Sequence, residues 1–191
     1  MREHEVNKLD NFIMGWYQNP EICDRIIDYF EDDNHEKAKG RTTKGIDLTI
    51  KDSFDLVLDG NLKGEYLNYL QNCVNLYVQK YPYVNEFNPW ACIEDINIQK
   101  YNPGGGYYQY HTERGNPHYP DTTRHMVFMT YLNDVTDGGE TEFLHQGIKI
   151  KPEKGLTILW GTDWTFTHRG VASPTQSKYI ATGWYNFVPF E

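Results

Sequence analysis

The chain has 191 residues and carries 27 acidic against 18 basic side chains, for a net charge of −9 at pH 7. This length fits a single domain with its own core. The charge argues against the basic surface that nucleic-acid binding needs. No apolar run approaches the ~18 residues of a membrane span, and the polar N-terminus lacks the apolar segment of a signal peptide. We therefore expect a soluble, cytoplasmic protein whose 3 widely spaced cysteines stay reduced.

Two helices are predicted in the first half of the chain. Asn19 can cap a helix that opens on Pro20, and an apolar stripe then runs through "NPEICDRIIDYF". A second helix follows the "DGN" break and ends before Pro82; its apolar face carries Leu62, Tyr66, Leu70, Val74 and Tyr77. Between the helices, residues 31–60 are polar and rich in turn formers, with one short strand predicted at "IDLTI" (46–50).

The pattern changes after Trp90, where short alternating or β-branched runs follow one another. They are "CIEDINIQKY", "GYYQYHTE", "RHMVFMTYLN", "ETEFL", "IKIKP", "GLTILWG", "TFTHRGV" and "KYIATGWYNF". Roughly eight short strands with turn signals between them predict a β-sandwich or barrel with the helices packed outside. We expect one α+β domain over residues 1–191, made of a helical N-terminal elaboration (1–90) and a β core (91–191).

One predicted strand pairs a histidine with a carboxylate. In "YYQYHTERG", His111 and Glu113 stand at positions i and i+2, so both project from the same face of an extended strand. Among the 7 histidines, His168 in "WTFTHRG" is the best-supported third ligand. Alternation along that segment, taken as a strand, places it on the same face as Trp164 and Phe166.

Lys178 opens the last predicted strand and shares its face with Ile180, Thr182 and Trp184. An inward-pointing cation is costly unless an anion lies beside it. Two imidazoles and one carboxylate on one side of an ion leave coordination positions open, which is typical of non-heme Fe(II) sites. A bidentate 2-oxoacid and O2 could take those positions, and Lys178 could hold a second carboxylate of the cosubstrate.

Four segments together carry a resemblance to a known family: "YNPGGGYYQYHTE", "RHMVFMTYLNDVTDGGETEF", "IKPEKGLTILW" and "HRGVASPTQSKYIATGWYNF". In this order, from about Cys92 to Phe187, they resemble the 2-oxoglutarate- and Fe(II)-dependent oxygenases, specifically their prolyl 4-hydroxylase-like branch. The resemblance implies a double-stranded β-helix, or jelly roll, for the core.

The resemblance also implies the metal ligands. His111 and His168 match the two histidine ligands of the family, and Glu113 stands where this branch usually has aspartate. A glutamate is one methylene longer, so it must fold back to keep the same metal–oxygen distance. These three residues are the predicted metal-binding and catalytic set.

For the cosubstrate, the resemblance implies four contacts. Lys178 matches the basic residue that pairs with the C5 carboxylate of 2-oxoglutarate. Tyr131 matches a tyrosine that helps to hold that carboxylate, and Tyr101 matches a tyrosine that lines the cosubstrate pocket. Trp184 matches an aromatic residue packed near the metal.

Two residues are expected to meet the substrate. Arg124 is similar to an arginine near the substrate in related hydroxylases. The spacing between Tyr107 and the first ligand is one residue longer than in many prolyl 4-hydroxylases, so either Tyr107 or Tyr108 could take the usual tyrosine position; Tyr108 is the predicted contact. The loops 31–60 and 114–123 are the expected lids, since loops carry specificity on rigid scaffolds.

The sequence thus predicts a dioxygenase that uses Fe(II), 2-oxoglutarate and O2, with ascorbate as a candidate reductant. Its expected reaction is hydroxylation of a C–H bond of a prolyl residue in a peptide or protein, with release of succinate and CO2. The alternatives are a hydroxylase of a free amino acid and a jelly roll that binds a partner without catalysis. A nucleic-acid dealkylase is disfavoured by the lysine at position 178 and by the net charge of −9. The oligomeric state stays open.

Overall fold

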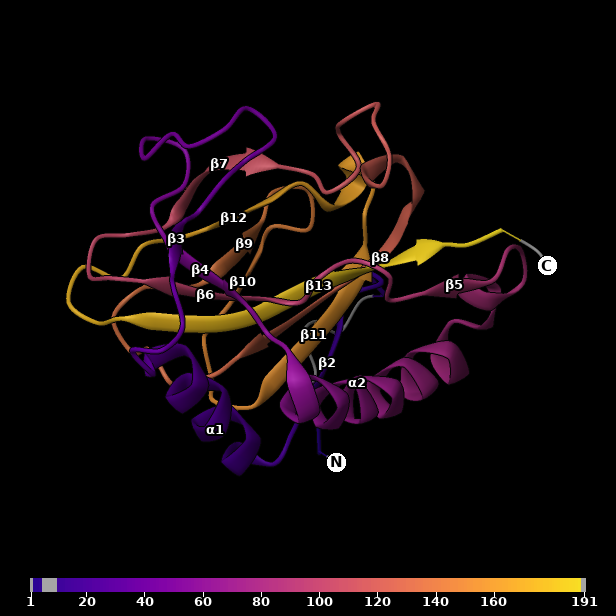
Figure 1. Ribbon diagram of the computed structural model, residues 1–191. Coiled ribbons are helices and arrows are strands. Elements are labelled where there is room, and N and C mark those ends of the chain that lie inside the picture. Colours follow the sequence, from indigo (N-terminus) through magenta and orange to yellow (C-terminus); the bar gives the residue numbers. More distant parts are fainter. Residues whose placement is uncertain (1, 5–9, 190–191) are drawn as a thin grey trace.

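Two antiparallel sheets form the protein, whose computed structural model describes residues 2–4 and 10–189 (Figure 1). The large sheet runs in the order β1 (Arg2–His4), β2 (Met14–Tyr17), β11 (Leu156–Gly161), β8 (Arg124–Tyr131), β13 (Lys178–Phe187), β6 (Asn97–Tyr101), β4 (Phe54–Val57) and β3 (Ala38–Lys39), and β5 (Trp90–Ala91) pairs with β13. The small sheet runs β10 (Ile148–Ile150), β9 (Thr141–Phe143), β12 (His168–Gly170) and β7 (Tyr107–His111).

The strands from β6 to β13 form a double-stranded β-helix. Along the chain, β6, β8, β11 and β13 enter the large sheet, whereas β7, β9, β10 and β12 enter the small one. The chain therefore passes back and forth between two layers that enclose a core. This arrangement confirms the predicted jelly roll, and each of the eight predicted runs contains one of these strands.

Alternation along β8 divides the core into two layers. Met126 and Phe128 belong to the apolar cluster beneath the helices, whereas Val127, Met129 and Tyr131 belong to the cluster between the sheets. Successive side chains of a strand point to opposite faces, and both faces of this central strand are buried. The large sheet is therefore the rigid wall against which the site is built.

Both predicted helices are confirmed, and they cover the outer face of the large sheet (Figure 1). Helix α1 (Pro20–Glu31) begins after Asn19, whose side chain accepts a hydrogen bond from the Glu21 N–H. Helix α2 (Gly60–Lys80) begins after Asp59 and gives way to the short helix η1 (Pro82–Asn85). In the described part of the chain, no helix is long and apolar enough to cross a membrane.

The N-terminal part of the chain is less purely helical than predicted. Residues before 90 contribute strands β1 to β4 to the large sheet. The strand predicted at residues 46–50 is wrong, because this segment forms a turn. The Asp47 carboxylate accepts hydrogen bonds from the Thr49 N–H and hydroxyl at 2.9 and 2.6 Å, and such local bonds compete with strand pairing.

A second correction concerns the segment before His168. Residues Trp164–Phe166 form a 3-10 helix, η3, instead of a strand, and Trp164 is 69% exposed. The Thr167 hydroxyl bonds the Trp164 carbonyl at 2.6 Å and favours this turn. His168 nevertheless opens β12 with its side chain buried, as predicted. Its inward orientation follows from its place in β12 and not from a strand face shared with Trp164 and Phe166. The remaining short helix, η2 (Asp121–Thr123), precedes β8.

We predict that Gly183→Ala destabilises the protein, because a Cβ on this β13 residue would lie 2.5 Å from Cζ of Phe128. Overpacking of this kind costs about 1–3 kcal/mol, measured as the free energy of unfolding in urea. Adding Phe128→Leu should restore part of the loss. Gly64→Ala is the matched control, since a Cβ there meets nothing within 4 Å and alanine favours helix α2. Equal stability of Gly183→Ala and wild type would contradict the packing described.

Candidate metal centre and its cavity

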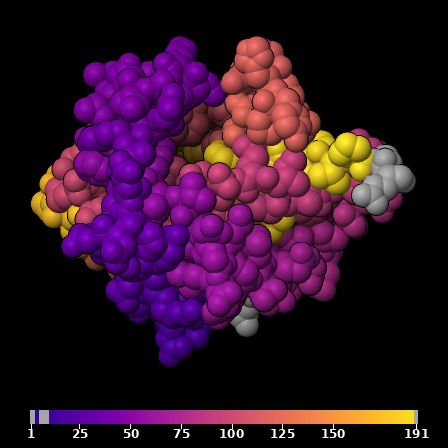
Figure 2. Space-filling view, viewed as in Figure 1, coloured from indigo at the N-terminus to yellow at the C-terminus, as the bar shows by residue number. Residues whose placement is uncertain are grey.

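A cavity of about 560 Å³ opens between the two sheets and two overhanging segments. Figure 2 shows the molecule hollowed between the purple lobe formed by residues near 40–50 and the salmon lobe formed by residues near 115–120. Arg41, Thr42 and Lys44 line the cavity from the first lobe, and Gly115 and Asn116 line it from the second. Both predicted lid loops thus reach the cavity.

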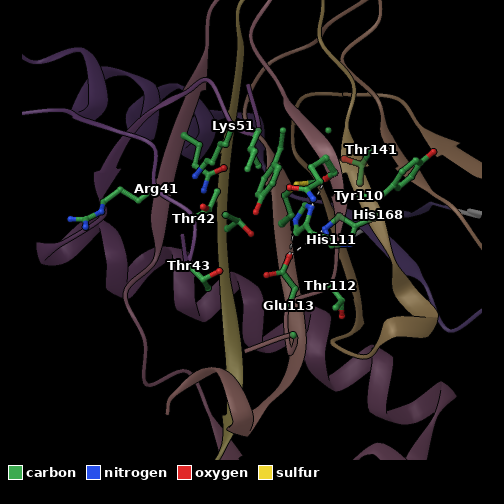
Figure 3. Close-up of a pocket in the computed structure, with 18 of the residues that line it drawn as sticks. Arg41, Thr42, Thr43, Lys51, Tyr110, His111, Thr112, Glu113, Thr141 and His168 are labelled. Atoms are coloured by element: carbon green, nitrogen blue, oxygen red, sulfur yellow. Dashed lines mark hydrogen bonds and ion pairs between the residues drawn. The ribbon is translucent and has the colours of Figure 1, made fainter. Parts of the chain in front are cut away.

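His111, Glu113 and His168 meet on the floor of this cavity (Figure 3). Strand pairing sets His168 directly opposite His111, and Glu113 follows β7 by two residues. Oε1 of Glu113 lies 3.4 Å from Nε2 of His111 and 3.3 Å from Nε2 of His168. One potential ligand atom from each residue lies within 4.8 Å of the others.

Backbone carbonyls fix both imidazole rings. Nδ1 of His111 lies 3.1 Å from the Gln109 oxygen, and Nδ1 of His168 lies 2.9 Å from the Phe166 oxygen. Because a carbonyl only accepts, each Nδ1 is the donor and each Nε2 carries a free lone pair. Two lone pairs and a carboxylate oxygen therefore converge without a donor between them, as the ligands of a divalent cation do.

The electrostatics of His111 and Glu113 favour the protonation state in which each side chain binds a metal. Burial lowers the pKa of His111, and the neighbouring His168 lowers it further, so that the ring is neutral. Burial alone raises the pKa of Glu113, but in the metal-free site an imidazole that takes up a proton on Nε2 donates to this carboxylate, and this holds the pKa of Glu113 well below its ordinary value. Neutral imidazoles and an ionised carboxylate are the forms that bind metals.

Lys178 is a buried cation in the same cavity. Its side chain is 4% exposed, and Nζ donates to the carbonyl oxygens of Gly139 at 2.9 Å and Val171 at 3.4 Å. No carboxylate of the described residues forms an ion pair with it. Burial lowers the pKa of Lys178 to about 8. An unpaired buried ammonium is expensive, so its position fits an anionic ligand.

The two predicted cosubstrate tyrosines differ in their access to the cavity. Tyr101 lines the cavity, and its ring centroid lies 5.0 Å from Lys178 Nζ. Tyr131 is fully buried outside the cavity lining, with its hydroxyl 2.6 Å from Oγ1 of Thr141. Thr141 is the residue that faces the cavity, so Tyr131 supports Thr141 from behind.

Of the two candidate tyrosines in β7, the structure brings Tyr107 to the cavity. Its ring stacks on that of His111 with centroids 3.7 Å apart and planes 9° apart. Tyr108 lies outside the lining, and its hydroxyl donates to the Gly104 carbonyl. Tyr107 thus shares the strand face of His111, whereas Tyr108, the residue predicted to contact the substrate, points away from that face.

Trp184 and Arg124 close one side of the cavity beside Glu113. Trp184 Nε1–H donates to Oε2 of Glu113 at 3.0 Å, and the Arg124 guanidinium carbon lies 3.6 Å from the centre of the Trp184 ring. Arg124 is ion-paired with Glu94 at 2.6 Å and with Asp121 at 3.1 Å. Its charge is therefore already matched within the protein.

Sequence reasoning missed two residues that matter here. Thr141 could have been found, since it lies two residues before the buried Phe143 in β9 and so shares its strand face. Glu94 gave no signal, because it lies in the bend between β5 and β6 and only the fold brings it to Arg124, at the start of β8. Lys51, also 4% exposed, lines the cavity but is paired with Asp55 at 2.7 Å.

These residues fit the group that the resemblance implies. Two imidazole nitrogens and one carboxylate oxygen are the donor set of 2-His-1-carboxylate Fe(II) sites. Lys178 adds the buried positive charge that a dicarboxylate cosubstrate would neutralise.

Comparisons with known proteins agree with this fold. Residues 96–186 match the family model of the 2OG-Fe(II) oxygenase superfamily. The chain is 24% identical over 108 residues to the prolyl 4-hydroxylase subunit alpha-1 of Gallus gallus, which covers 49% of this chain and 21% of the chicken protein.

Two solved structures share the fold. The viral collagen prolyl hydroxylase from Paramecium Bursaria Chlorella virus-1, solved as a 2OG complex, has a TM-score of 0.67 at 21% identity, covering 94% of this chain and 98% of the viral one. The prolyl hydroxylase from Trichoplax adhaerens, solved with a hypoxia inducible factor oxygen degradation domain peptide fragment, has a TM-score of 0.72 at 17% identity, covering 93% and 84%.

Residues 96–186 of this chain are therefore similar to the 2OG-Fe(II) oxygenase superfamily, and the chain shares its fold with solved prolyl hydroxylases. This confirms the resemblance carried by the four sequence segments. The superfamily uses Fe(II), 2-oxoglutarate and O2. The chain spans only about a fifth of the length of the chicken relative that it matches.

We predict that Lys178→Met stabilises the ligand-free protein at pH 7, because it removes an unpaired buried charge. The folded pKa of about 8 lies below the ordinary value of 10.5, so the unfolded chain binds the proton more tightly. Below pH 8 the full penalty applies, on the order of 1–3 kcal/mol, and it fades as the pH rises from 8 to 10.5. Urea unfolding at pH 7 and pH 9.5 would measure it.

Lys51→Met is the matched control for this prediction. Lys51 is equally buried but paired, so its removal leaves the carboxylate of Asp55 without its cation. We expect Lys51→Met to destabilise the protein by about 1–3 kcal/mol. If both variants changed stability in the same direction, Lys178 would not be the uncompensated cation described.

Proposed function

We propose that the protein is an Fe(II)- and 2-oxoglutarate-dependent dioxygenase that hydroxylates a prolyl residue of a peptide or protein. One observation carries the proposal: a three-ligand face with convergent lone pairs shares a cavity with a buried cation that forms no ion pair among the described residues, since Glu140 acts on it only through its charge. A metal site alone would not need the cation. A dicarboxylate that binds the metal at one end and the lysine at the other needs both.

In this proposal His111, Glu113 and His168 hold Fe(II), and Lys178 binds the distal carboxylate of 2-oxoglutarate. Thr141, steadied by the Tyr131 hydroxyl, lies beside that carboxylate as a neutral hydrogen-bond donor. When bound, the metal and 2-oxoglutarate supply the oxidation of a C–H bond by O2, with succinate and CO2 as coproducts. The protein's share is to orient both partners and to exclude water from the reacting atoms.

The shape of the cavity supports a peptide as the substrate. It opens between the lobes near residues 40–50 and 115–120, which leaves a channel that an extended chain could enter (Figure 2). A free amino acid would leave this channel largely unfilled. The names of the matched relatives, which are prolyl hydroxylases, favour proline as the target. The net charge of −9 argues against nucleic acid as substrate.

The proposal includes a reducing, cytoplasmic compartment. Its support is the state of the three cysteines, none of which forms a disulfide in the described part of the chain. Burial raises the pKa of the Cys23 thiol to about 11 and that of Cys73 to about 12, so both are unreactive side chains of the core.

The test is a turnover assay under air with Fe(II), 2-oxoglutarate, ascorbate as reductant and a panel of proline-containing peptides. We expect peptide-stimulated succinate formation, and mass spectrometry should place one added oxygen on proline. Glu113→Ala is the negative control. Succinate formed at the same rate with every peptide, or stimulated only by free amino acids, would overturn the peptide substrate. No succinate from the wild type under any condition would favour the binding-module alternative.

We predict that Lys178→Ala weakens 2-oxoglutarate binding by roughly 10- to 150-fold, because a charge-assisted hydrogen bond worth ~1.5–3 kcal/mol is lost. Wild-type affinity should also fall as the pH rises above about 8, where the free lysine loses its proton. Calorimetric titration of the Mn(II)-loaded protein measures both effects. A pH-independent affinity in the wild type, matched by Lys178→Ala, would show that the cosubstrate is anchored elsewhere.

A further inference from the structure

The two oxygens of the Glu113 carboxylate face different partners. Oε1 faces the Nε2 atoms of both histidines, whereas Oε2 accepts the indole N–H of Trp184. We propose that Trp184, held in place by Arg124, is a positioning residue that fixes a glutamate in the ligand position. This inference rests on the proposed metal site.

The need for such a residue follows from the length of glutamate. Its carboxylate can rotate about one more side-chain bond than that of an aspartate, so more conformations must be excluded before it binds a metal. A hydrogen bond to Oε2 restricts the rotation of the carboxylate and leaves Oε1 turned toward the two histidines. The glutamate is then arranged to bind through one oxygen.

Arg124 in turn fixes the indole ring of Trp184. Its guanidinium carbon lies 3.6 Å from the centre of the ring, and Nη1 donates to the backbone oxygen of Glu113 at 3.1 Å. The same residue therefore contacts the main chain of the ligand and the side chain that holds the ligand's carboxylate.

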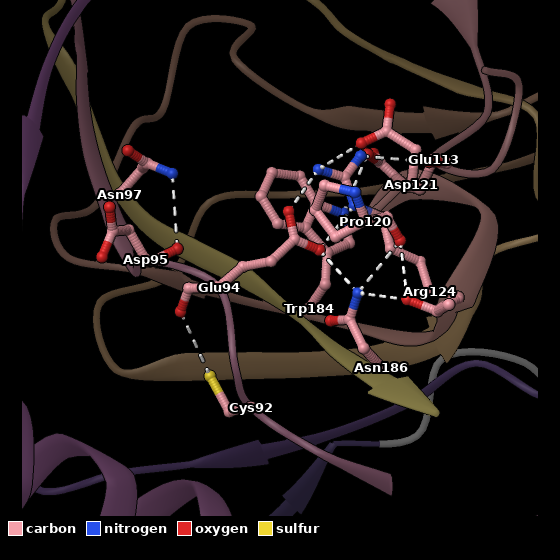
Figure 4. A network of polar contacts seen from close by, with 11 residues as sticks. Cys92, Glu94, Asp95, Asn97, Glu113, Pro120, Asp121, Arg124, Trp184 and Asn186 are labelled. Atoms are coloured by element: carbon pink, nitrogen blue, oxygen red, sulfur yellow. Dashed lines mark hydrogen bonds and ion pairs between the residues drawn. The ribbon is translucent and has the colours of Figure 1, made fainter. Parts of the chain in front are cut away.

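Acidic side chains hold Arg124 itself (Figure 4). Glu94 accepts from Nε at 2.8 Å and from Nη2 at 2.6 Å, and Asp121 lies 3.1 Å from Nη2. The buried Asn186 donates to Glu94 at 2.8 Å and so fixes that carboxylate. All three guanidinium nitrogens of Arg124 are therefore engaged within the protein. These contacts account for its position without the substrate contact that the sequence predicts.

The first test measures metal affinity rather than turnover. Mn(II) binding to the purified full chain is followed by the loss of the free-ion EPR signal. We expect Trp184→Phe, which keeps a ring beneath Arg124 but removes the N–H, to bind Mn(II) about 10- to 100-fold more weakly than wild type. Thermal unfolding of each variant checks that the fold is kept.

A double-mutant cycle then separates positioning from a general effect on the cavity. Glu113→Asp has a carboxylate too short to reach both the histidines and Trp184. In that background we expect Trp184→Phe to change the Mn(II) affinity by less than about threefold, because the contact is already lost. An equal loss in both backgrounds would overturn the inference, since Trp184 would then act without Glu113.

Two further variants test the role of Arg124. Glu94→Gln loosens its anchor without deleting it and should weaken Mn(II) binding by roughly 3- to 10-fold. Glu142→Gln is the matched control: it disturbs a similar cluster, in which Arg169 pairs with Glu142 at 2.7 Å and lies over the Tyr110 ring, but which makes no contact with Glu113. Equal effects of the two substitutions would contradict the inference.

A second readout needs no metal. In the metal-free protein labelled with ¹⁵N, the indole resonance that disappears in Trp184→Phe is that of Trp184. We expect Glu113→Ala to move this resonance upfield, as loss of a hydrogen bond to a carboxylate does. An unmoved resonance would overturn only the inference about Trp184 and would leave the proposed metal site standing. Failure of the wild type to bind Mn(II), with the resonance shifted as expected, would instead overturn the proposed metal site.

Discussion

The pairing of β7 with β12 is the constraint on which the site depends. Its register sets His111 opposite His168, which brings together two residues that lie far apart in the sequence. A slip of one residue in either strand would turn one imidazole to the other face of the sheet. The pairing of β12 with β9 on its other side and the stack of Tyr107 on His111 hold that register. Glu113 comes only two residues after His111, so the short chain segment between them brings it to the same place.

The large sheet supplies the opposite wall, to which strand β13 contributes four residues. Lys178, Ile180, Thr182 and Trp184 line the cavity from alternate positions of this strand. One end of β13 therefore carries the cation, and the other carries the indole that contacts Glu113. Because β13 lies between β8 and β6 in the middle of the sheet, neither group can shift without disturbing the core. The protein keeps a buried, unpaired charge there at the expense of stability, as functional sites often do.

Much of the core could be predicted from the sequence, because alternation of side chains is a local property. The strands β6 to β13 and both helices lie in the segments where apolar periodicity placed them. The same rule put Lys178 and Trp184 on one face. The turn at residues 46–50 and the short helix Trp164–Phe166 were missed, since local hydrogen bonds from Asp47 and Thr167 outweigh strand propensity there.

What the sequence could not reveal is the set of contacts made across strands. The choice between Tyr107 and Tyr108 depended on which side of β7 faces the cavity. The clamp on Arg124 depends on Glu94, which no spacing rule connects with it. Strands β1 to β4 were missed because they are 2 to 4 residues long, too short for periodicity to distinguish them from loops.

The central claim is that the three ligands and Lys178 form one site for a metal and a 2-oxoacid together. The most direct measurement is the visible absorption spectrum of the anaerobic protein loaded with Fe(II) and then with 2-oxoglutarate. We expect a weak charge-transfer band that appears only when both are present, disappears in Glu113→Ala, and needs more 2-oxoglutarate in Lys178→Ala. A wild-type protein that shows no band, or a band unchanged in Glu113→Ala, would contradict the claim.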